Sequence, residues 1–202
     1  MALFAEPPDE ALKAAIEMLK NLVIYNHRRL KAGYIPIRIG IGIHTGNLIL
    51  GTIGGEFRMD STVISDAVNL ASRMEGMTKI YGASLLISED TFHSLNNPSD
   101  YSFRIVDRVV AKGKSKPVTI YECIDDSSEE IKKAKLSTLE KFEEGIAFYK
   151  IGDFIKAKKL FQECLAQYPE DKAAQVYIER CEYHRKIGVD SSWNGVTILD
   201  TK

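Results

Sequence analysis

The stretch SDAVNLASR, residues 65–73, predicts the start of a helix with two polar side chains at a functional spacing. Ser65 or Asp66 can cap this helix, because either side-chain oxygen can accept a hydrogen bond from a free backbone amide of the first turn. Asn69 and Arg73 are four residues apart and therefore share one helix face. An amide beside a planar cation can hold a sugar oxygen and a phosphoryl charge together. Taken alone, such a pair is more often a solvated helix face.

The residues before this helix predict a β-hairpin. Isoleucine alternates with other residues over 37–44, which predicts a strand with one apolar face. Gly40 and Gly42 lie on its other face and indicate that another element packs close to the backbone there. Residues 45–47 form the predicted turn and residues 48–53 the returning strand. His44, at the strand end, is interpreted as structural.

Helical and strand patterns alternate along the first 125 residues. A helix is predicted from Asp9, as its cap, to about residue 31, and Gly33 ends it. The remaining patterns predict strands and one short helix, at residues 84–87, 88–95 (helix), 102–110 and 118–124. This order predicts an α+β fold.

Four short motifs carry a resemblance to a known family. They are IRIGIGIHTG (37–46), GTIG (51–54), MDSTVI (59–64) and VAKGK (110–114), arranged around the Asn69/Arg73 helix. In this order they resemble the catalytic domain of class III nucleotidyl cyclases, over residues 1–125. The resemblance implies a ferredoxin-like sandwich that is incomplete at its N-terminus. It also implies a phosphorus–oxygen lyase of intracellular signalling, which releases pyrophosphate and forms a cyclic nucleotide at a dimer interface.

The resemblance implies roles for four residues. Asn69 would orient the ribose, and Arg73 would stabilise the pentavalent phosphate. Thr62 matches a purine-reading position, where its hydroxyl can accept from adenine N6 or donate to N1, so ATP is favoured over GTP. Lys112 would reach the triphosphate. Alternatively, Thr62 is an ordinary β-branched strand residue and Lys112 an ordinary solvated lysine.

The metal ligands of the family have no counterpart in this chain. The family binds Mg²⁺ or Mn²⁺ through two aspartates that lie upstream of text resembling residues 1–4. Asp9 and Glu10 begin a helix and are poor substitutes, while Asp66 is better explained by favourable charge at a helix N-terminus. We therefore expect Met1 to be an internal methionine of a longer cyclase. We also expect little or no activity from this chain alone. The expected partners are ATP and either a second copy of this chain or a complete cyclase chain, and a homodimer would lack the metal carboxylates in both of its sites.

Beyond residue 125 the composition changes. An acidic linker is predicted over residues 126–136, followed by helices over 137–187 and an extended tail over 188–202. The helices resemble a tetratricopeptide repeat (TPR), with matching residues at Gly145, Phe148, Gly152, Ala157, Phe161 and Pro169. One and a half repeats cannot bury a continuous core, so the helices are expected to lean on the first domain, another copy or a partner. An alternative function is a non-catalytic, cyclase-like dimerisation module with a protein-interaction segment.

Composition restricts the remaining function classes. The chain has 202 residues, with 27 Lys and Arg against 28 Asp and Glu, so no basic field favours nucleic acid. Three scattered cysteines indicate reduced thiols rather than a disulfide framework or a zinc site. No apolar run is long enough for a membrane span, and a cytoplasmic location is expected.

Overall fold

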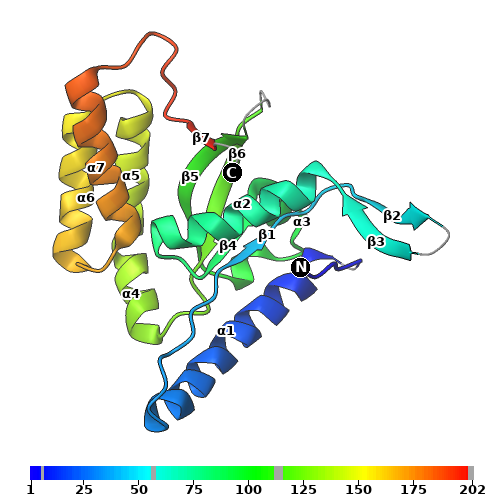
Figure 1. Cartoon of the computed structure of the whole chain (residues 1–202). Helices are drawn as coiled ribbons and strands as arrows, with labels where there is room; N and C mark the ends of the chain where they lie inside the picture. Colours follow the sequence, from blue (N-terminus) through cyan, green and yellow to red (C-terminus); the bar gives the residue numbers. More distant parts are fainter. Residues whose placement is uncertain (6, 56–57, 112–115, 200–202) are drawn as a thin grey trace.

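The computed structural model describes residues 1–5, 7–55, 58–111 and 116–199. It combines helices and strands, and the predicted α+β class is confirmed (Figure 1). The elements of the first 125 residues are α1 (Pro8–Lys31), β1 (Ile41–Ile43), β2 (Ile49–Gly55), β3 (Arg58–Ile64), α2 (Asp66–Tyr81), β4 (Leu85–Ser88), α3 (Glu89–Ser94), a 3-10 turn (Pro98–Asp100), β5 (Phe103–Ala111) and β6 (Val118–Cys123). They are followed by α4 (Glu129–Ser137), α5 (Leu139–Lys150), α6 (Phe154–Gln167), α7 (Lys172–Ile187) and β7 (Thr197–Leu199).

The central sheet has five strands in the order β1-β4-β6-β5-β7. Strand β1 runs parallel to β4, and β4, β6 and β5 are antiparallel neighbours. Strand β7 belongs to the tail that was predicted to be extended, and it pairs parallel with the end of β5. Strands β2 and β3 form a separate antiparallel hairpin, which projects from the rest of the molecule (Figure 1).

The predicted hairpin between residues 37–44 and 48–53 is wrong in its pairing. Strand β1 pairs with β4, whereas β2 pairs with β3 in a register that opposes Ile49 and Ile64. The turn residues after His44 lead toward the start of α2, where the Ser65 hydroxyl donates to the carbonyl of Asn47. The chain therefore leaves β1 toward α2, and residues 49–55 pair with residues 58–64.

The two faces of the sheet are covered by different helices. Strand β4 is buried along its whole length, as expected for a central strand with both faces covered. Leu85 and Ile87 pack with the apolar face of α1, whereas Leu86 between them joins the core that contains α2. This alternation follows from the two-residue period of a strand. Helices α1 and α2 therefore pack against opposite faces.

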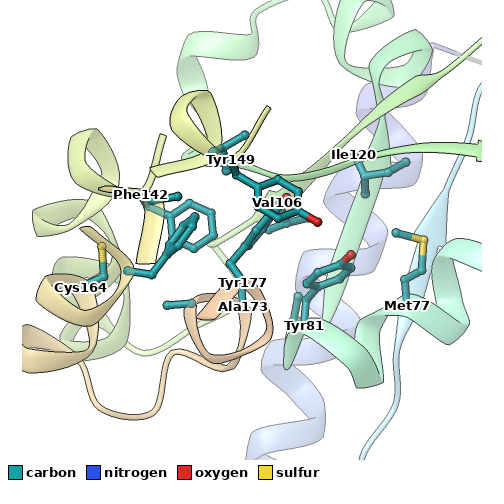
Figure 2. Packing of buried hydrophobic residues seen from close by; sticks show 14 of the residues in the cluster. Met77, Tyr81, Val106, Ile120, Phe142, Tyr149, Cys164, Ala173 and Tyr177 are labelled. Atoms are coloured by element: carbon teal, nitrogen blue, oxygen red, sulfur yellow. The ribbon is translucent and has the colours of Figure 1, made fainter. Parts of the chain in front are cut away.

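Helices α4–α7 (residues 129–187), called the helical unit below, pack against the face that carries α2. The sequence left three possible supports for these helices, namely the first domain, another copy or a partner. The structure shows packing against the first domain, residues 1–125. One hydrophobic cluster is continuous across both parts, from Met77 and Ile120 to Phe142 and Cys164, with Tyr177 between them (Figure 2). Helix α4 begins within the predicted linker, residues 126–136, and ends one residue beyond it.

A buried ionic cluster joins the same two parts. Arg104 of β5 donates to the Glu122 carboxylate of β6 at 2.6 Å and to both carboxylate oxygens of Asp171 at 2.6 and 2.9 Å. Lys135 of α4 donates to the other oxygen of Glu122 at 2.6 Å. Asp171 also caps α7, by accepting from the Ala174 amide. Two cations and two anions balance there, which is the condition for burying charge.

Candidate functional site at helix α2

Helix α2 begins at the capping residue Ser65. The Ala67 amide donates to the Ser65 hydroxyl oxygen at 3.0 Å, so the serine is the cap and Asp66 is the first helical residue. The helix ends at Gly82, whose φ of 64° is the left-handed conformation that glycine adopts readily. A single uninterrupted helix therefore carries the two predicted site residues.

Asn69 and Arg73 lie one turn apart on α2, as their spacing predicts. Asn69 is exposed and Arg73 is half-buried. Met77 is one turn beyond Arg73, and both Met74 and Met77 are buried in the core. Asn69 is therefore open to a ligand, whereas Arg73 lies at the edge of the buried face of the helix.

The close approach predicted at Gly40 and Gly42 is confirmed, and the element that approaches is α2. A Cβ atom built on Gly42 would lie 2.5 Å from the Ala71 carbonyl oxygen and 2.6 Å from the Glu75 amide nitrogen. One built on Gly40 would lie 1.9 Å from the Thr78 hydroxyl oxygen. Only glycine fits these two positions without displacing α2. The contact with Ala71 holds the helix between Asn69 and Arg73.

The structure gives less information on the other two predicted site residues, Thr62 and Lys112. Thr62 lies in β3 and pairs with Gly51 across the hairpin. Lys112 lies outside the described residues. The segment that contains it joins β5, which ends at Ala111, to β6, which begins at Val118.

His44 has partners that fit its structural interpretation. Its Nδ1 atom lies 2.7 Å from the Ser88 hydroxyl oxygen and 3.9 Å from the Asp90 carboxylate. Burial lowers the pKa of His44, and Asp90 offsets part of that effect. The imidazole therefore joins the end of β1 to the start of α3.

The acidic residues near the N-terminus of α1 already have partners within the protein. The Asp9 carboxylate accepts hydrogen bonds from the Asn96 amide nitrogens at 3.1–3.3 Å, so Asp9 is not the helix cap that the sequence predicts. Glu10 accepts from Lys13 at 3.1 Å. Among the described residues, no group of three or more His, Cys, Asp or Glu could hold a metal ion. Asp9 and Glu10 therefore do not offer a free pair of carboxylates for a divalent cation.

Sequence reasoning missed the contacts that hold the far end of α2. Tyr81, its last residue, donates to the carboxylate of Asp107 on β5, and Arg180 of α7 donates to both residues. A bulge in β5 shifts the register between Ile105 and Asp107, so Val106 and Asp107 are both buried although they are adjacent. The available signal was the sequence of β5, in which the charged residues Arg104, Asp107 and Arg108 interrupt the apolar pattern of a strand.

Within the part of the chain that the structure describes, none of the helices has both the length and the apolar character of a membrane span.

Comparison with known proteins identifies the family of this region. The model of the family described as the adenylate and guanylate cyclase catalytic domain matches residues 5–123, more than half of the chain. This range contains α2 and the whole sheet except β7.

Curated relatives extend this similarity. The terminal-differentiation-specific adenylate cyclase of Dictyostelium discoideum is 38% identical over 172 residues, which are 85% of this chain and 8% of that protein. That alignment is longer than the family match and reaches into the helical unit. The adenylate cyclase of Anabaena cylindrica is 47% identical over 128 residues, 60% of this chain and 26% of that protein. This chain therefore spans only a small part of these relatives.

Solved structures with similarity to this chain include two cyclases. The adenylyl cyclase CyaB from P. aeruginosa overlaps with a TM-score of 0.46 and 31% identity, covering 56% of this chain and 57% of that one. The guanylyl cyclase Cya2 overlaps with a TM-score of 0.47 and 28% identity, covering 64% of each chain. On the strength of the match over residues 5–123, this chain belongs to the adenylate and guanylate cyclase catalytic domain family.

Proposed function

We propose that this chain is part of a class III adenylate cyclase and supplies the Asn69 and Arg73 side of a composite ATP site. The observation that carries the proposal is the presentation of these two residues. They lie one turn apart on α2, with Asn69 exposed and Arg73 half-buried, and the glycine contact at Gly42 fixes the backbone between them. A rigid helix that offers an amide and a guanidinium suits the binding of a nucleotide.

Each residue has a distinct role in the proposed reaction. Cyclisation of ATP is an in-line attack of the ribose 3′-oxygen on the α-phosphorus, so catalysis depends on positioning and charge stabilisation. Asn69 orients the ribose, and Arg73 stabilises charge on the phosphoryl oxygens in the transition state. Thr62 reads the adenine and Lys112 binds the triphosphate. Removal of one preorganised donor of this kind raises the barrier by about 3–4 kcal/mol.

The metal ligands are proposed to come from a second chain. When bound, Mg²⁺ or Mn²⁺ would neutralise phosphate charge in the complete enzyme. The engagement of Asp9 with Asn96 and of Glu10 with Lys13 supports a source of metal ligands outside this chain. We therefore propose that this chain is inactive alone and forms cyclic AMP only when paired with a chain that carries the metal carboxylates.

An exposed apolar surface supports this pairing. Among the described residues, β1 is an edge strand of the sheet. Ile35 in the segment before it is 82% exposed, and Val23 of α1 is 65% exposed. Unpaired strand edges and exposed apolar side chains are features of protein interfaces. The proposed occupant of this surface is a second cyclase chain.

The C-terminal helices have a proposed identity of their own. We propose that residues 137–187 are a TPR-like unit. Ala157 and Phe161 of α6 are fully buried, and a Cβ atom on Gly145 of α5 would lie 2.9 Å from the Phe161 ring. Small and aromatic residues packed between consecutive helices in this way support the assignment.

A complementation experiment tests the proposal. The chain is mixed with the adenylate cyclase of Anabaena cylindrica in which the residues equivalent to Asn69 and Arg73 are alanine, and cyclic AMP is measured with ATP and Mn²⁺. We expect neither protein to be active alone and the mixture to be active. Arg73→Ala should lower kcat of the mixture by about 10²–10³-fold. Lys79→Ala removes an exposed cation from the same helix and should leave kcat unchanged.

Two results would contradict the proposal. Cyclic AMP formation by this chain alone, abolished by Arg73→Ala, would show that no second chain is needed. A mixture that forms a stable complex by sedimentation but makes no cyclic AMP would instead support the non-catalytic dimerisation module.

A further inference from the structure

The C-terminal end of α2 is held by a polar cluster formed by Tyr81, Asp107 and Arg180, called the α2 anchor below. Tyr81 donates its hydroxyl proton to Asp107 Oδ2. Arg180 Nη1 donates to the same carboxylate oxygen at 3.2 Å, and Arg180 Nη2 donates to the Tyr81 hydroxyl oxygen at 2.9 Å. The Asp107 side chain is fully buried. A buried carboxylate requires such partners, so the three side chains hold one another in place.

The anchor joins α2 to two other elements. Tyr81 is the last residue of α2, Asp107 lies on β5, and Arg180 lies on α7 of the helical unit. A second contact between α7 and α2 reinforces it, because Lys172 Nζ donates to the Lys79 carbonyl oxygen at 2.8 Å. A cation at this carbonyl is favourable, because the last carbonyls of a helix lack partners within the helix and carry partial negative charge. Helix α7 therefore fixes the end of α2 at two points.

A rigid helix transmits this constraint to the proposed site. Arg73 is eight residues before Tyr81, which corresponds to about 12 Å along an α-helix. Between them, Thr78 lies against Gly40, and ahead of Arg73 the Ala71 backbone lies against Gly42. The sheet thus limits how far α2 can move sideways. Rotation about the helix axis is the motion that the anchor is placed to prevent, because Tyr81 extends from the axis to β5 and α7.

We propose that Tyr81, Asp107 and Arg180 are positioning residues of the nucleotide site, through which the helical unit sets the direction of Asn69 and Arg73. This inference rests on the proposed function of those two residues. In this inference α7 affects the rate of the reaction, whereas a module that only recruits a partner would not. Misplacement of a catalytic group by about 1 Å can lower the rate by about 10²-fold, so a small rotation of α2 is sufficient.

Tyr177 provides a matched control for Tyr81. Its hydroxyl also donates to Asp107, to Oδ1 at 3.3 Å, and its ring is also buried. Tyr177 belongs to α7, however, and its hydroxyl donates to Asp107 of β5 rather than to a residue of α2. Tyr81→Phe and Tyr177→Phe each remove a phenolic hydroxyl from Asp107 and keep the ring, but only the first loosens α2. If Tyr81 and Tyr177 only stabilised the fold, each variant would lose turnover in proportion to its own loss of stability.

The test measures kcat and KM for ATP in the mixture described above, with the urea midpoint of each variant as the measure of stability. Tyr81→Phe is expected to lower kcat by about 10-fold or more while KM changes less than about twofold. Tyr177→Phe is expected to change neither value by more than about twofold. Equal losses of kcat in the two variants, or an unchanged kcat in Tyr81→Phe, would overturn the inference.

Amide hydrogen exchange of this chain alone separates this inference from the proposed function. Peptides covering residues 66–81 should exchange faster in Tyr81→Phe than in Tyr177→Phe, because only the first variant frees the end of α2. Equal exchange in both would overturn the anchor even if the mixture is active. If the unmodified mixture makes no cyclic AMP, the proposed function fails, and faster exchange confined to Tyr81→Phe would still support the anchor.

Discussion

Replacing Arg104 by methionine is expected to lower the free energy of unfolding by about 3–5 kcal/mol. The Arg104 side chain is 1% exposed and contacts the carboxylates of Glu122 and Asp171, which are 2% and 0% exposed. Its guanidinium also lies 4.7 Å from the centre of the Phe142 ring. Methionine replaces the apolar stem of Arg104 but has no atoms where the guanidinium lies, so the change removes the charge, the hydrogen bonds and the contact with the Phe142 ring.

The magnitude follows from the charge balance of this cluster. Without Arg104, the single cation Lys135 faces the carboxylates of Glu122 and Asp171, and one buried negative charge has no counterpart. Removing one partner of a buried ion pair typically costs about 3–5 kcal/mol, because the remaining charge stays desolvated. A domain of this kind is stable by about 5–15 kcal/mol in total. The loss expected from Arg104→Met is therefore a large part of the total free energy of unfolding.

Urea denaturation followed by circular dichroism measures the effect. Lys141→Met is the control, because its ion pair with Glu163 has a similar length, 2.8 Å, but its side chains are 41% and 39% exposed. The control should lose less than about 1 kcal/mol. Adding Asp171→Asn to Arg104→Met should destabilise the protein less than the sum of the single changes, since the unbalanced charge is removed. A loss in Arg104→Met no larger than in the control would refute this account of the cluster.

Three further predictions concern other parts of the molecule. Gly42→Ala should cost about 1–3 kcal/mol in urea denaturation, because its Cβ would lie 2.5 Å from backbone of α2, and an unchanged midpoint would contradict that contact. Burial lowers the pKa of His184 in the folded protein. The stability that this residue contributes is therefore complete above its unfolded-state pKa, near 6.5, and is lost as the pH falls through its lower pKa in the folded protein. His184→Phe should therefore reduce the loss of stability between pH 8 and about pH 5. An unchanged dependence of stability on pH would exclude His184 as the source of that loss. Burial raises the pKa of Cys164 to about 11 and of Cys181 to about 12, so both thiols should react slowly with a disulfide reagent until urea unfolds the protein.

Helix ends were predictable because their signals are local. Gly33, with a φ of 79°, follows the end of α1, and Ser65 caps α2 with its own hydroxyl. The close packing at Gly40 and Gly42 was also predictable, because absence of a side chain is itself a local signal. The identity of the neighbour was not, since α2 is separated from these glycines by the hairpin of β2 and β3.

Strand pairing was the part that local patterns predicted poorly. Residues 45–47 resemble a hairpin turn, but β1 pairs with β4, more than forty residues further on. Both arrangements satisfy the same alternation of isoleucine and other residues. Backbone hydrogen bonds are nearly independent of the side chains that flank them, so the choice depends on which arrangement buries more apolar surface across the whole domain.

The sequence by itself determined that α2 exists, where it begins, and that Asn69 and Arg73 lie one turn apart on it, because these depend on one residue's preferences and on the helical period. Only the tertiary structure decided what holds that helix in place. Asp107 and Arg180 are 73 residues apart and meet Tyr81 because β5 is bulged and α7 packs beside α2. Burial makes such distant charges dependent on one another, and a linear pattern of residues contains no record of which charges will be buried together.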